Sequence, residues 1–267
     1  MRELLFRLYK FKILKRTIPS ILKRINKFFI KSYITINHEN FKLKVNLNNP
    51  IDREIFLTKK YEEENIFFLQ KLIKENNINY FFDVGAHMGF YSLNMASAFP
   101  NLLVASFEPI ESNFKQLKSN VELNNIESKI KIYKKILSNK SEKMKMWVSD
   151  KNKTGGFSVY DEKDQEIKRY DASKITYEFS FSERLDNIYK IKNEKIALKI
   201  DVERHEKYVI MGAEKIFNNN KVILQIEIFD QQKQEVESML NKMNFYFIKS
   251  NEKDNFYSNF SDSFNNI

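Results

Sequence analysis

The stretch YFFDVGAHMGFY, from Tyr80 to Tyr91, decides the fold. Apolar and aromatic residues lead up to Asp83, and a turn containing Gly85 and Gly89 follows before the apolar pattern resumes. This order predicts a strand, a tight turn and a helix, which is the opening of a doubly wound α/β domain. Glycine at position 85 allows a sharp turn at the end of a buried strand, and Gly89 allows the helix to begin close to a nucleotide-like ligand.

The glycine spacing indicates which class of ligand the turn binds. Dinucleotide-binding turns use three glycines, spaced G-x-G-x-x-G, whereas this turn has two. Asp83 would also repel a pyrophosphate. S-adenosylmethionine has no phosphate and carries a cationic ammonium and sulfonium, so an acidic residue suits it. Glu108 ends the second apolar run and is placed to accept both ribose hydroxyls, so the two acids together favour a methyl donor over a nicotinamide.

Length and composition limit the remaining possibilities. A chain of 267 residues with 42% hydrophobic content is long enough for one large α/β domain with appendages. The chain has no cysteine, which excludes disulfides, thiolate nucleophiles, cysteine-ligated metals and cysteine-dependent base methylation. The absence of cysteine also fits a reducing, cytoplasmic compartment.

Nearly all of the net charge of +10 lies in residues 1–32, which contain ten Lys or Arg and one acid. Apolar residues recur there at helical spacing, interrupted at Pro19, and predict two basic amphipathic helices. No apolar run is long enough to span a bilayer. This arm either binds the inner face of an anionic membrane as a peripheral contact or packs on its own domain or a second subunit. The methyltransferase domain is expected from residue 33 to residue 267, and because this body is nearly neutral we expect no nucleic-acid partner.

Hydrophobic patterns predict the remaining elements. Residues 33–46 alternate as in a hairpin, with His38 as a solvated residue in its turn. Residues 51–74 read as helical, and we expect Glu62 and its acidic neighbours to form a solvated face rather than reach the methionine end of the cofactor. Further strands are predicted at 102–107, 130–137, 196–201 and 222–229, with helices at 90–99, 111–124 and 232–242 and a closing hairpin. At the end of the third strand, Ile136 and Leu137 are candidates for the adenine pocket.

Residues 144–182 depart from the βα alternation and predict an insertion that covers the substrate. Its turn contains Gly156 and Phe157, which are candidate substrate contacts. Trp147 and Phe157 either stack on a ring of the acceptor or fill the core of the insertion.

Several ordered blocks together are similar to one family. The blocks are DVGAHMGFYS, FEP followed by NFKQLKSNVELNN, GGFS, RLDNI, and KIDVERHEKYVIMGAEKI followed by ILQIEI. They resemble the FkbM family of S-adenosylmethionine-dependent methyltransferases over about residues 51–248. The resemblance implies a class I, Rossmann-like fold with a seven-stranded, mostly parallel sheet. It also implies O-methylation of hydroxyls on sugars, polyketides and other metabolites, and many members resemble enzymes of bacterial surface-polysaccharide pathways.

The resemblance also implies roles for individual residues. Those that match or flank the cofactor motifs are Asp83, Gly85, Ala86, His87, Gly89, Phe90, Glu108 and Pro109, with His87 where the family usually has asparagine. Asp201, Glu203 and Glu206 match the family block Asp-Val-Glu-Gly-x-Glu. Arg204 stands in place of its glycine, where it either binds an acidic group of the acceptor or pairs with a neighbouring carboxylate.

Methyl transfer to a hydroxyl needs positioning and benefits from a base. His205, Glu203 and Asp201 are the candidate bases, and Asp201, Glu203 and Glu227 are also possible ligands for magnesium. One alternative is a nucleic-acid methyltransferase, but no Asn/Asp-Pro-Pro-aromatic motif occurs. Another is a non-catalytic, membrane-associated scaffold, which would not need acids at two strand ends. The acceptor, whether a glycan or a small molecule with a hydroxyl, and the oligomeric state are not specified by these patterns.

Overall fold

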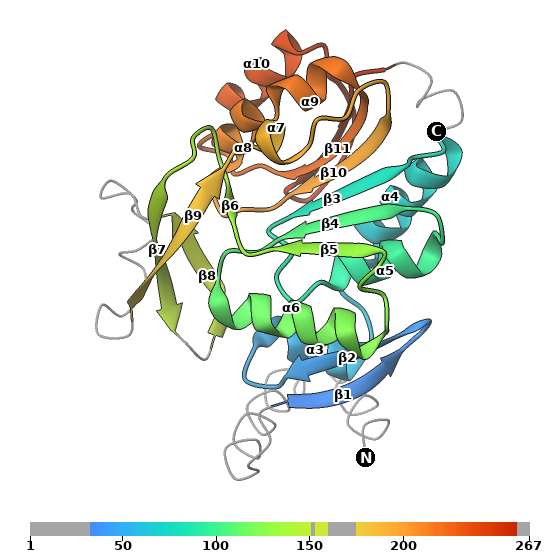
Figure 1. The fold of residues 1–267 in the computed structure, drawn as a ribbon, viewed down its shortest axis with the longest axis vertical. Coiled ribbons are helices and arrows are strands. Elements are labelled where there is room, and N and C mark those ends of the chain that lie inside the picture. Colours follow the sequence, from blue (N-terminus) through green and yellow to red (C-terminus); the bar gives the residue numbers. More distant parts are fainter. Residues whose placement is uncertain (1–32, 151–152, 160–174, 261–267) are drawn as a thin grey trace.

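The computed structural model describes residues 33–150, 153–159 and 175–260 (Figure 1). The predicted basic arm, parts of the predicted insertion (151–152 and 160–174) and residues 261–267 lie outside the described residues. A seven-stranded sheet forms the centre, in the order β12-β13-β11-β10-β3-β4-β5. Strands β3, β4, β5, β10 and β11 are parallel, and β13 runs antiparallel to β11 and β12. The predicted seven-stranded, mostly parallel sheet of the class I methyltransferase fold is therefore confirmed. The strands are β3 (Tyr80–Val84), β4 (Leu103–Phe107), β5 (Ile130–Tyr133), β10 (Lys195–Ile200), β11 (Lys221–Glu227), β12 (Tyr246–Asn251) and β13 (Asp254–Ser258).

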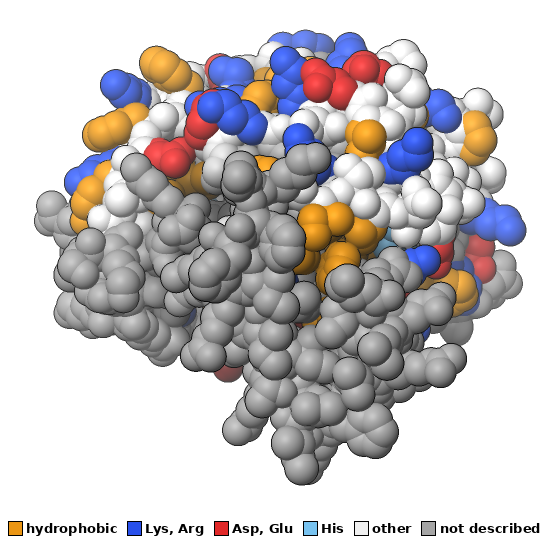
Figure 2. Space-filling view, turned by 90° about the horizontal axis from the view of Figure 1, so that it is seen from below, with side chains coloured by type: hydrophobic (Ala, Val, Ile, Leu, Met, Phe, Trp, Pro, Cys, Tyr) orange, Lys and Arg blue, Asp and Glu red, His pale blue; other side chains and the backbone are white. Residues whose placement is uncertain are grey.

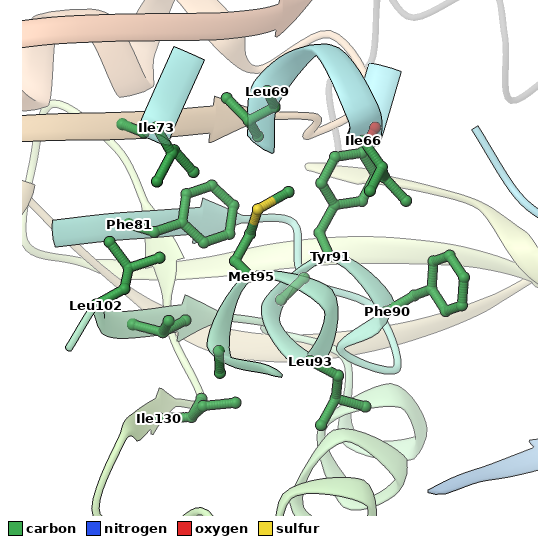
Figure 3. Close-up of a cluster of buried hydrophobic side chains, with 14 of the residues drawn as sticks. Ile66, Leu69, Ile73, Phe81, Phe90, Tyr91, Leu93, Met95, Leu102 and Ile130 are labelled. Carbon is green, nitrogen blue, oxygen red and sulfur yellow. The ribbon is translucent and has the colours of Figure 1, made fainter. Parts of the chain in front are cut away.

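Helices cover both faces of this sheet, as side-chain alternation along the strands requires (Figure 1). Phe81 faces α4 (Glu63–Glu75), α5 (Phe90–Ala98) and α6 (Glu111–Leu123), and Figure 3 shows its ring among side chains such as Leu69 and Met95. Phe82 faces the opposite layer, formed by α7 (Leu185–Ile188), α8 (Glu206–Gly212), α9 (Glu214–Asn219) and α10 (Lys233–Lys242). Both faces of the central strands are buried, so the carboxyl ends of the strands remain the open edge at which a ligand binds.

The predicted hairpin is confirmed as β1 (Tyr33–His38) and β2 (Phe41–Asn46), a separate two-stranded sheet that packs on α6. Its histidine was predicted wrongly. His38 ends β1, is buried, stacks on Phe41 and places its Nε2 atom 2.8 Å from the carbonyl oxygen of Lys59. The sequence between the hairpin and β3 forms two helices, α3 (Pro50–Thr58) and α4, because Lys59 and Glu62 adopt left-handed backbone conformations that end one helix and precede the next.

The strand predicted over residues 130–137 is broken after Tyr133. Its first part is β5 of the main sheet, and its second part, β6 (Ile136–Leu137), belongs to another sheet of order β6-β9-β7-β8. The other strands of that sheet are β7 (Lys143–Asp150), β8 (Lys153–Val159) and β9 (Thr176–Glu183), and they form the described part of the predicted insertion. Trp147 is fully buried in β7, which favours the alternative that it fills the core of the insertion. Among the described residues, no helix combines the length and the apolar character needed to cross a bilayer.

Candidate active site

The turn after β3 is held against the ends of both neighbouring strands. Gly85 has a φ angle of +85°, and a Cβ atom at this position would lie 1.8 Å from the main-chain oxygen of Asp201, at the end of β10. On the other side, the N–H groups of Gly85 and Ala86 both donate to the carbonyl oxygen of Phe107 at 3.0 Å. Glycine is therefore needed here because the ends of β3 and β10 approach more closely than a side chain allows.

The second predicted glycine, Gly89, lies where two helices pack together. Gly89 has a φ angle of +87° immediately before α5, but it does not line the cavity at the strand ends. A Cβ atom at Gly89 would lie 2.5 Å from Cδ1 of Leu117 in α6. Gly89 thus permits α5 to pack against α6, and its predicted approach to a ligand stays a prediction.

Glu108 is buried at the end of β4 and connects two segments of the site. Its Oε2 atom accepts a hydrogen bond from the main-chain N–H of His87 at 2.8 Å, and its Oε1 atom accepts one from Ile110 at 2.8 Å. Burial raises the pKa of Glu108 to about 7. The Nε2 atom of His87 lies 3.2 Å from Nδ2 of Asn49, so the turn also contacts the chain immediately before α3. The carboxylate predicted to bind ribose thus fixes the turn through the His87 N–H.

A single cavity brings the predicted residues of β3, β4, β6, β10 and β11 together. Met146 and Val159 of the insertion also line it. Asp83 and Glu108, which the sequence predicts to bind one ligand together, line a common crevice. The predicted site residues that line it are Asp83, Gly85, Ala86, His87, Phe90, Glu108, Pro109, Ile136, Leu137, Asp201, Glu203, His205 and Glu227. Gly156 and Phe157 lie on β8, but their side chains are outside the described residues.

A family comparison agrees with this geometry. Residues 83–255 match the model of the Methyltransferase FkbM domain. The chain belongs to the FkbM methyltransferase family. The domain spans all of the main sheet except the beginning of β3 and the last residues of β13, and it includes the turn, Glu108 and the Asp201 block.

Solved structures with similar folds have distant sequences. They include the precorrin-6y C5,15-methyltransferase from Geobacter metallireducens (10% identity, TM-score 0.43, covering 75% of this chain and 89% of that one). A human methyltransferase 10 domain containing protein has 10% identity and a TM-score of 0.47, with coverage of 90% and 95%. A putative caffeoyl-CoA O-methyltransferase from Staphylococcus aureus has 12% identity and a TM-score of 0.45, with coverage of 78% and 91%. No curated protein matches the chain significantly in sequence.

In this FkbM domain, the ends of β10 and β11 carry a pair of partly buried acids, Asp201 and Glu227. Burial alone would raise the pKa of Asp201. The Lys199 ammonium and a hydrogen bond from Glu227 lower this pKa instead. The Nζ atom of Lys199 lies 2.8 Å from Oδ2 of Asp201. Burial, and next the neighbouring carboxylates of Asp201 and Glu203, raise the pKa of Glu227 to about 9. At neutral pH, Asp201 is therefore ionised and Glu227 carries the proton of their shared hydrogen bond.

His205 lines the cavity but is a weak base. Its Nε2 atom lies 3.0 Å from Oγ of Ser138, and its ring packs at a tilt against the Tyr208 ring, with the centroids 4.7 Å apart. Burial, followed by the nearby charge of Lys207, lowers the pKa of His205 to about 4. The imidazole is therefore neutral at pH 7 and able to accept a proton, with little driving force to keep it.

Arg204 preserves the backbone conformation that the family glycine favours, since its φ angle is +76°. Its guanidinium lies 5.2 Å from the ring centroid of Phe229, and Arg204 is not among the residues that line the cavity. The main-chain N–H of Arg204 donates to Oε1 of Glu206, which is buried outside the cavity. The predicted partners of Arg204, an acidic group of the acceptor or a neighbouring carboxylate, stay predictions. Glu206 holds the loop through its hydrogen bond to the Arg204 N–H.

The predicted magnesium ligands do not form a metal site. Across the described ranges 33–150, 153–159 and 175–260, no group of three or more His, Asp or Glu side chains is arranged to hold a metal ion. Asp201 is instead engaged by Lys199 and Glu227. These residues therefore do not fit a divalent ion.

Three charged side chains that line the cavity, those of Glu62, Lys199 and Asp254, were missed or misjudged from the sequence. Glu62, expected on a solvated face, accepts a hydrogen bond from the Tyr91 hydroxyl at 2.6 Å and lines the cavity. Lys199 and Asp254 line it as well. The one signal for Lys199 was a lysine inside the apolar run IALKID.

The charges of the cavity fit the cofactor that the fold implies. Of its charged lining residues, seven are acids and two are lysines: Glu62, Asp83, Glu108, Asp201, Glu203, Glu227 and Asp254, with Lys135 and Lys199. An excess of acids suits a cationic ligand and opposes a pyrophosphate. With the glycine cradle at position 85, this donor set fits S-adenosylmethionine, so the FkbM domain is an S-adenosylmethionine-dependent methyltransferase.

Proposed function

We propose that the protein is an O-methyltransferase that acts on a hydroxyl of a sugar or glycan. The supporting observation is that Asp83 and Glu108 share one acid-rich cavity with the Asp201 block and with the inner side of the insertion. The cofactor supplies a sulfonium methyl group that a hydroxyl oxygen can displace. Asp83 and Glu108 orient it from the ends of β3 and β4, and Ile136 and Leu137 provide an apolar contact for the adenine.

The chain's own side chains handle the hydroxyl proton. Asp201 is ionised and able to accept a hydrogen bond from the acceptor, while the protonated Glu227 keeps it in place. The proton is taken up at Nε2 of His205 or at a carboxylate oxygen of Glu203 or Asp201, all of which line the cavity. Because these groups are weak bases, most of the acceleration in this proposal comes from positioning.

The insertion supports a non-nucleic-acid acceptor. Met146 and Val159 line the cavity beside Ile110, which gives that end an apolar wall suited to the CH-rich face of a sugar ring. On the face shown in Figure 2, the Lys and Arg side chains of the described residues are interspersed with acidic and apolar ones rather than gathered in a basic stripe. A bacterial surface polysaccharide or a related glycoconjugate fits this setting, and the basic arm 1–32 would hold the enzyme at the inner face of the membrane.

Two measurements test this proposal. Calorimetry with S-adenosylhomocysteine, the demethylated product, should give saturable binding to the full chain, whereas a folded sample without binding would indicate a scaffold. Mass spectrometry of surface glycans from a strain lacking the protein should then show sugars that keep a free hydroxyl in place of the methoxy group and are lighter by one CH2 unit. Unchanged glycans, with methyl transfer to RNA or DNA in vitro, would refute the glycan acceptor in favour of a nucleic acid.

A further inference from the structure

The insertion presents two faces of different chemistry. Side chains alternate along its strands, and on one face Met146 of β7 and Val159 of β8 line the cavity. On the opposite face of β9 lie Tyr177, Phe179 and Phe181, whose side chains are exposed to 46%, 57% and 62%. The sheet therefore lines the cavity with one side and displays a row of three aromatic rings on the other.

Two lysines of β7 lie among these rings. In the register of β7 and β9, Lys145 is paired with Phe179 and Lys143 with Phe181. The Nζ atom of Lys145 lies 3.9 Å from the centroid of the Tyr177 ring, and that of Lys143 lies 5.0 Å from the centroid of the Phe179 ring. These are cation–π distances, so the ammonium groups lie at the level of the rings. We call these five residues the aromatic–lysine face.

Glu183 follows Phe181 on the same side of β9, at the end of the row. Its Oε1 atom accepts a hydrogen bond from Nδ2 of Asn187 at 2.8 Å and one from the main-chain N–H of Arg184 at 2.9 Å. This carboxylate is thus held against the start of α7. The aromatic–lysine face itself carries two positive charges and no acid.

Exposed aromatic rings gathered on one face mark an interaction surface. A phenylalanine ring has no group that can form a hydrogen bond with water, so its exposure costs free energy that a partner can recover. Aromatic rings together with lysines are typical of the interfacial region of a membrane. The rings enter the boundary between headgroups and acyl chains, and the ammonium groups bind anionic headgroups.

The charge of the neighbouring sequence favours the same partner. Residues 1–32, with ten Lys or Arg and one acid, lead directly into β1 at Tyr33. Helix α3 contacts both β2 of that hairpin and β8 of the insertion (Figure 1). The basic arm therefore joins the described structure at a hairpin that α3 links to the insertion.

We propose that the aromatic–lysine face binds the surface of an anionic lipid bilayer. A second copy of this face, or the basic arm itself, would oppose lysines with further cations, and like-charge repulsion disfavours both. An anionic bilayer offers negative charge and an apolar layer to the same face. Membrane contact here requires neither the cofactor nor an acceptor. One consequence rests on the proposed function: because the other side of the sheet lines the cavity, this placement suits an acceptor sugar that is carried on a lipid.

Vesicle flotation of the full chain tests the proposal, with vesicles of phosphatidylcholine with and without phosphatidylglycerol. Phe179→Ser combined with Phe181→Ser should weaken binding to the anionic vesicles by about tenfold or more, because both rings lose their apolar contact. Lys143→Gln should weaken this binding by about fivefold and leave any binding to neutral vesicles unchanged.

Tyr246→Ser combined with Phe247→Ser is the matched control. These side chains are 58% and 56% exposed on β12, the edge strand of the main sheet. The control removes a similar amount of exposed aromatic surface elsewhere on the molecule and should bind vesicles like the wild type. Circular dichroism of each variant should match the wild-type spectrum, which identifies any loss that comes from unfolding.

A fluorescent label separates contact through this face from contact through the arm alone. The chain has no cysteine, so Phe181→Cys gives a single site for a dye whose emission increases in an apolar environment. The emission should increase when anionic vesicles are added. The same dye at Phe247→Cys should not respond. This measurement also decides the question if the double serine variant does not fold.

Two outcomes overturn the membrane contact. One is equal binding of anionic vesicles by the wild type and by the folded double serine variant at 179 and 181. The other is vesicle-bound protein whose label at position 181 does not respond. If that variant instead loses binding to single-stranded RNA or an acidic polysaccharide, or loses self-association in sedimentation, while vesicle binding is unchanged, the face belongs to that partner. Binding of S-adenosylhomocysteine should be the same in all variants, and its absence in the wild type would overturn the proposed function alone.

Discussion

Replacing Gly85 with alanine tests the closest main-chain contact in the site. Alanine at a φ angle of +85° costs about 1 kcal/mol relative to glycine. The new Cβ atom would also lie 1.8 Å from the main-chain oxygen of Asp201, so the ends of β3 and β10 must separate. Overpacking of this kind adds about 1–3 kcal/mol. We therefore expect Gly85→Ala to lower the free energy of unfolding by about 2–4 kcal/mol, a large part of the typical total of about 5–15 kcal/mol.

Gly89→Ala is the matched control, because its φ angle of +87° carries the same backbone cost. Its new Cβ atom would meet Cδ1 of Leu117 at 2.5 Å, and the end of a leucine side chain can move where a main-chain carbonyl cannot. Urea unfolding followed by circular dichroism should give a lower midpoint for Gly85→Ala than for Gly89→Ala. Calorimetry should also show weaker S-adenosylhomocysteine binding for Gly85→Ala, since Asp201 is displaced. Equal midpoints, or a larger loss for Gly89→Ala, would refute the reasoning.

Three further predictions concern protons and metal. Burial raises the pKa of Glu206 to about 7, so its contribution to stability is present below its ordinary pKa of about 4.5 and is lost as the pH rises to 7. Glu206→Gln should remove this pH-dependent loss of stability. The variant should be more stable than the wild type at pH 8, by at most about 3 kcal/mol, but not at pH 4. Parallel plots of the free energy of unfolding in urea against pH for the two proteins would contradict this prediction. Glu227→Gln should retain activity at pH 7, because its amide also donates to Asp201. Above about pH 9, where Glu227 ionises, any loss of activity seen in the wild type should be absent from the variant. An inactive variant at pH 7 would show that the Glu227 proton itself is needed. Treatment with EDTA should leave methyl transfer unchanged, because Asp201 is paired with Lys199; inactivation that magnesium reverses would show that the acids rearrange around a metal.

The parts of the fold that local sequence determines could be predicted. The strand, turn and helix around Gly85 follow from a buried apolar run and a glycine, which act within about ten residues of each other. The acids at the strand ends follow in the same way, because parallel strands place their carboxyl ends at one edge. Reading Asp83 and Glu108 as neighbours required only the topology.

Contacts between distant segments could not be predicted in this way. His38 reads as a polar turn residue, yet it is buried because Phe41 and Phe90 close around its ring. Glu62 lies in an acidic run typical of a solvated helix face, but its left-handed backbone at the start of α4 and the Tyr91 hydroxyl bring it to the cavity. The split between β5 and β6 depends on β9, which pairs with β6 and begins about forty residues further along the chain.

Protonation is a further property that only the assembled site reveals. A count of side chains gives the cavity seven acids, a charge too large to bury without compensation. Burial raises the pKa of Glu227 to about 9, that of Glu108 to about 7 and that of Asp254 to about 6, so part of this charge is absent at neutral pH. Lys199 compensates for Asp201. A cationic ligand bound among these acids favours their ionised forms, so its binding releases protons from the cavity. The protonated acids keep the site stable without the ligand, and the ionised acids attract the ligand when it binds.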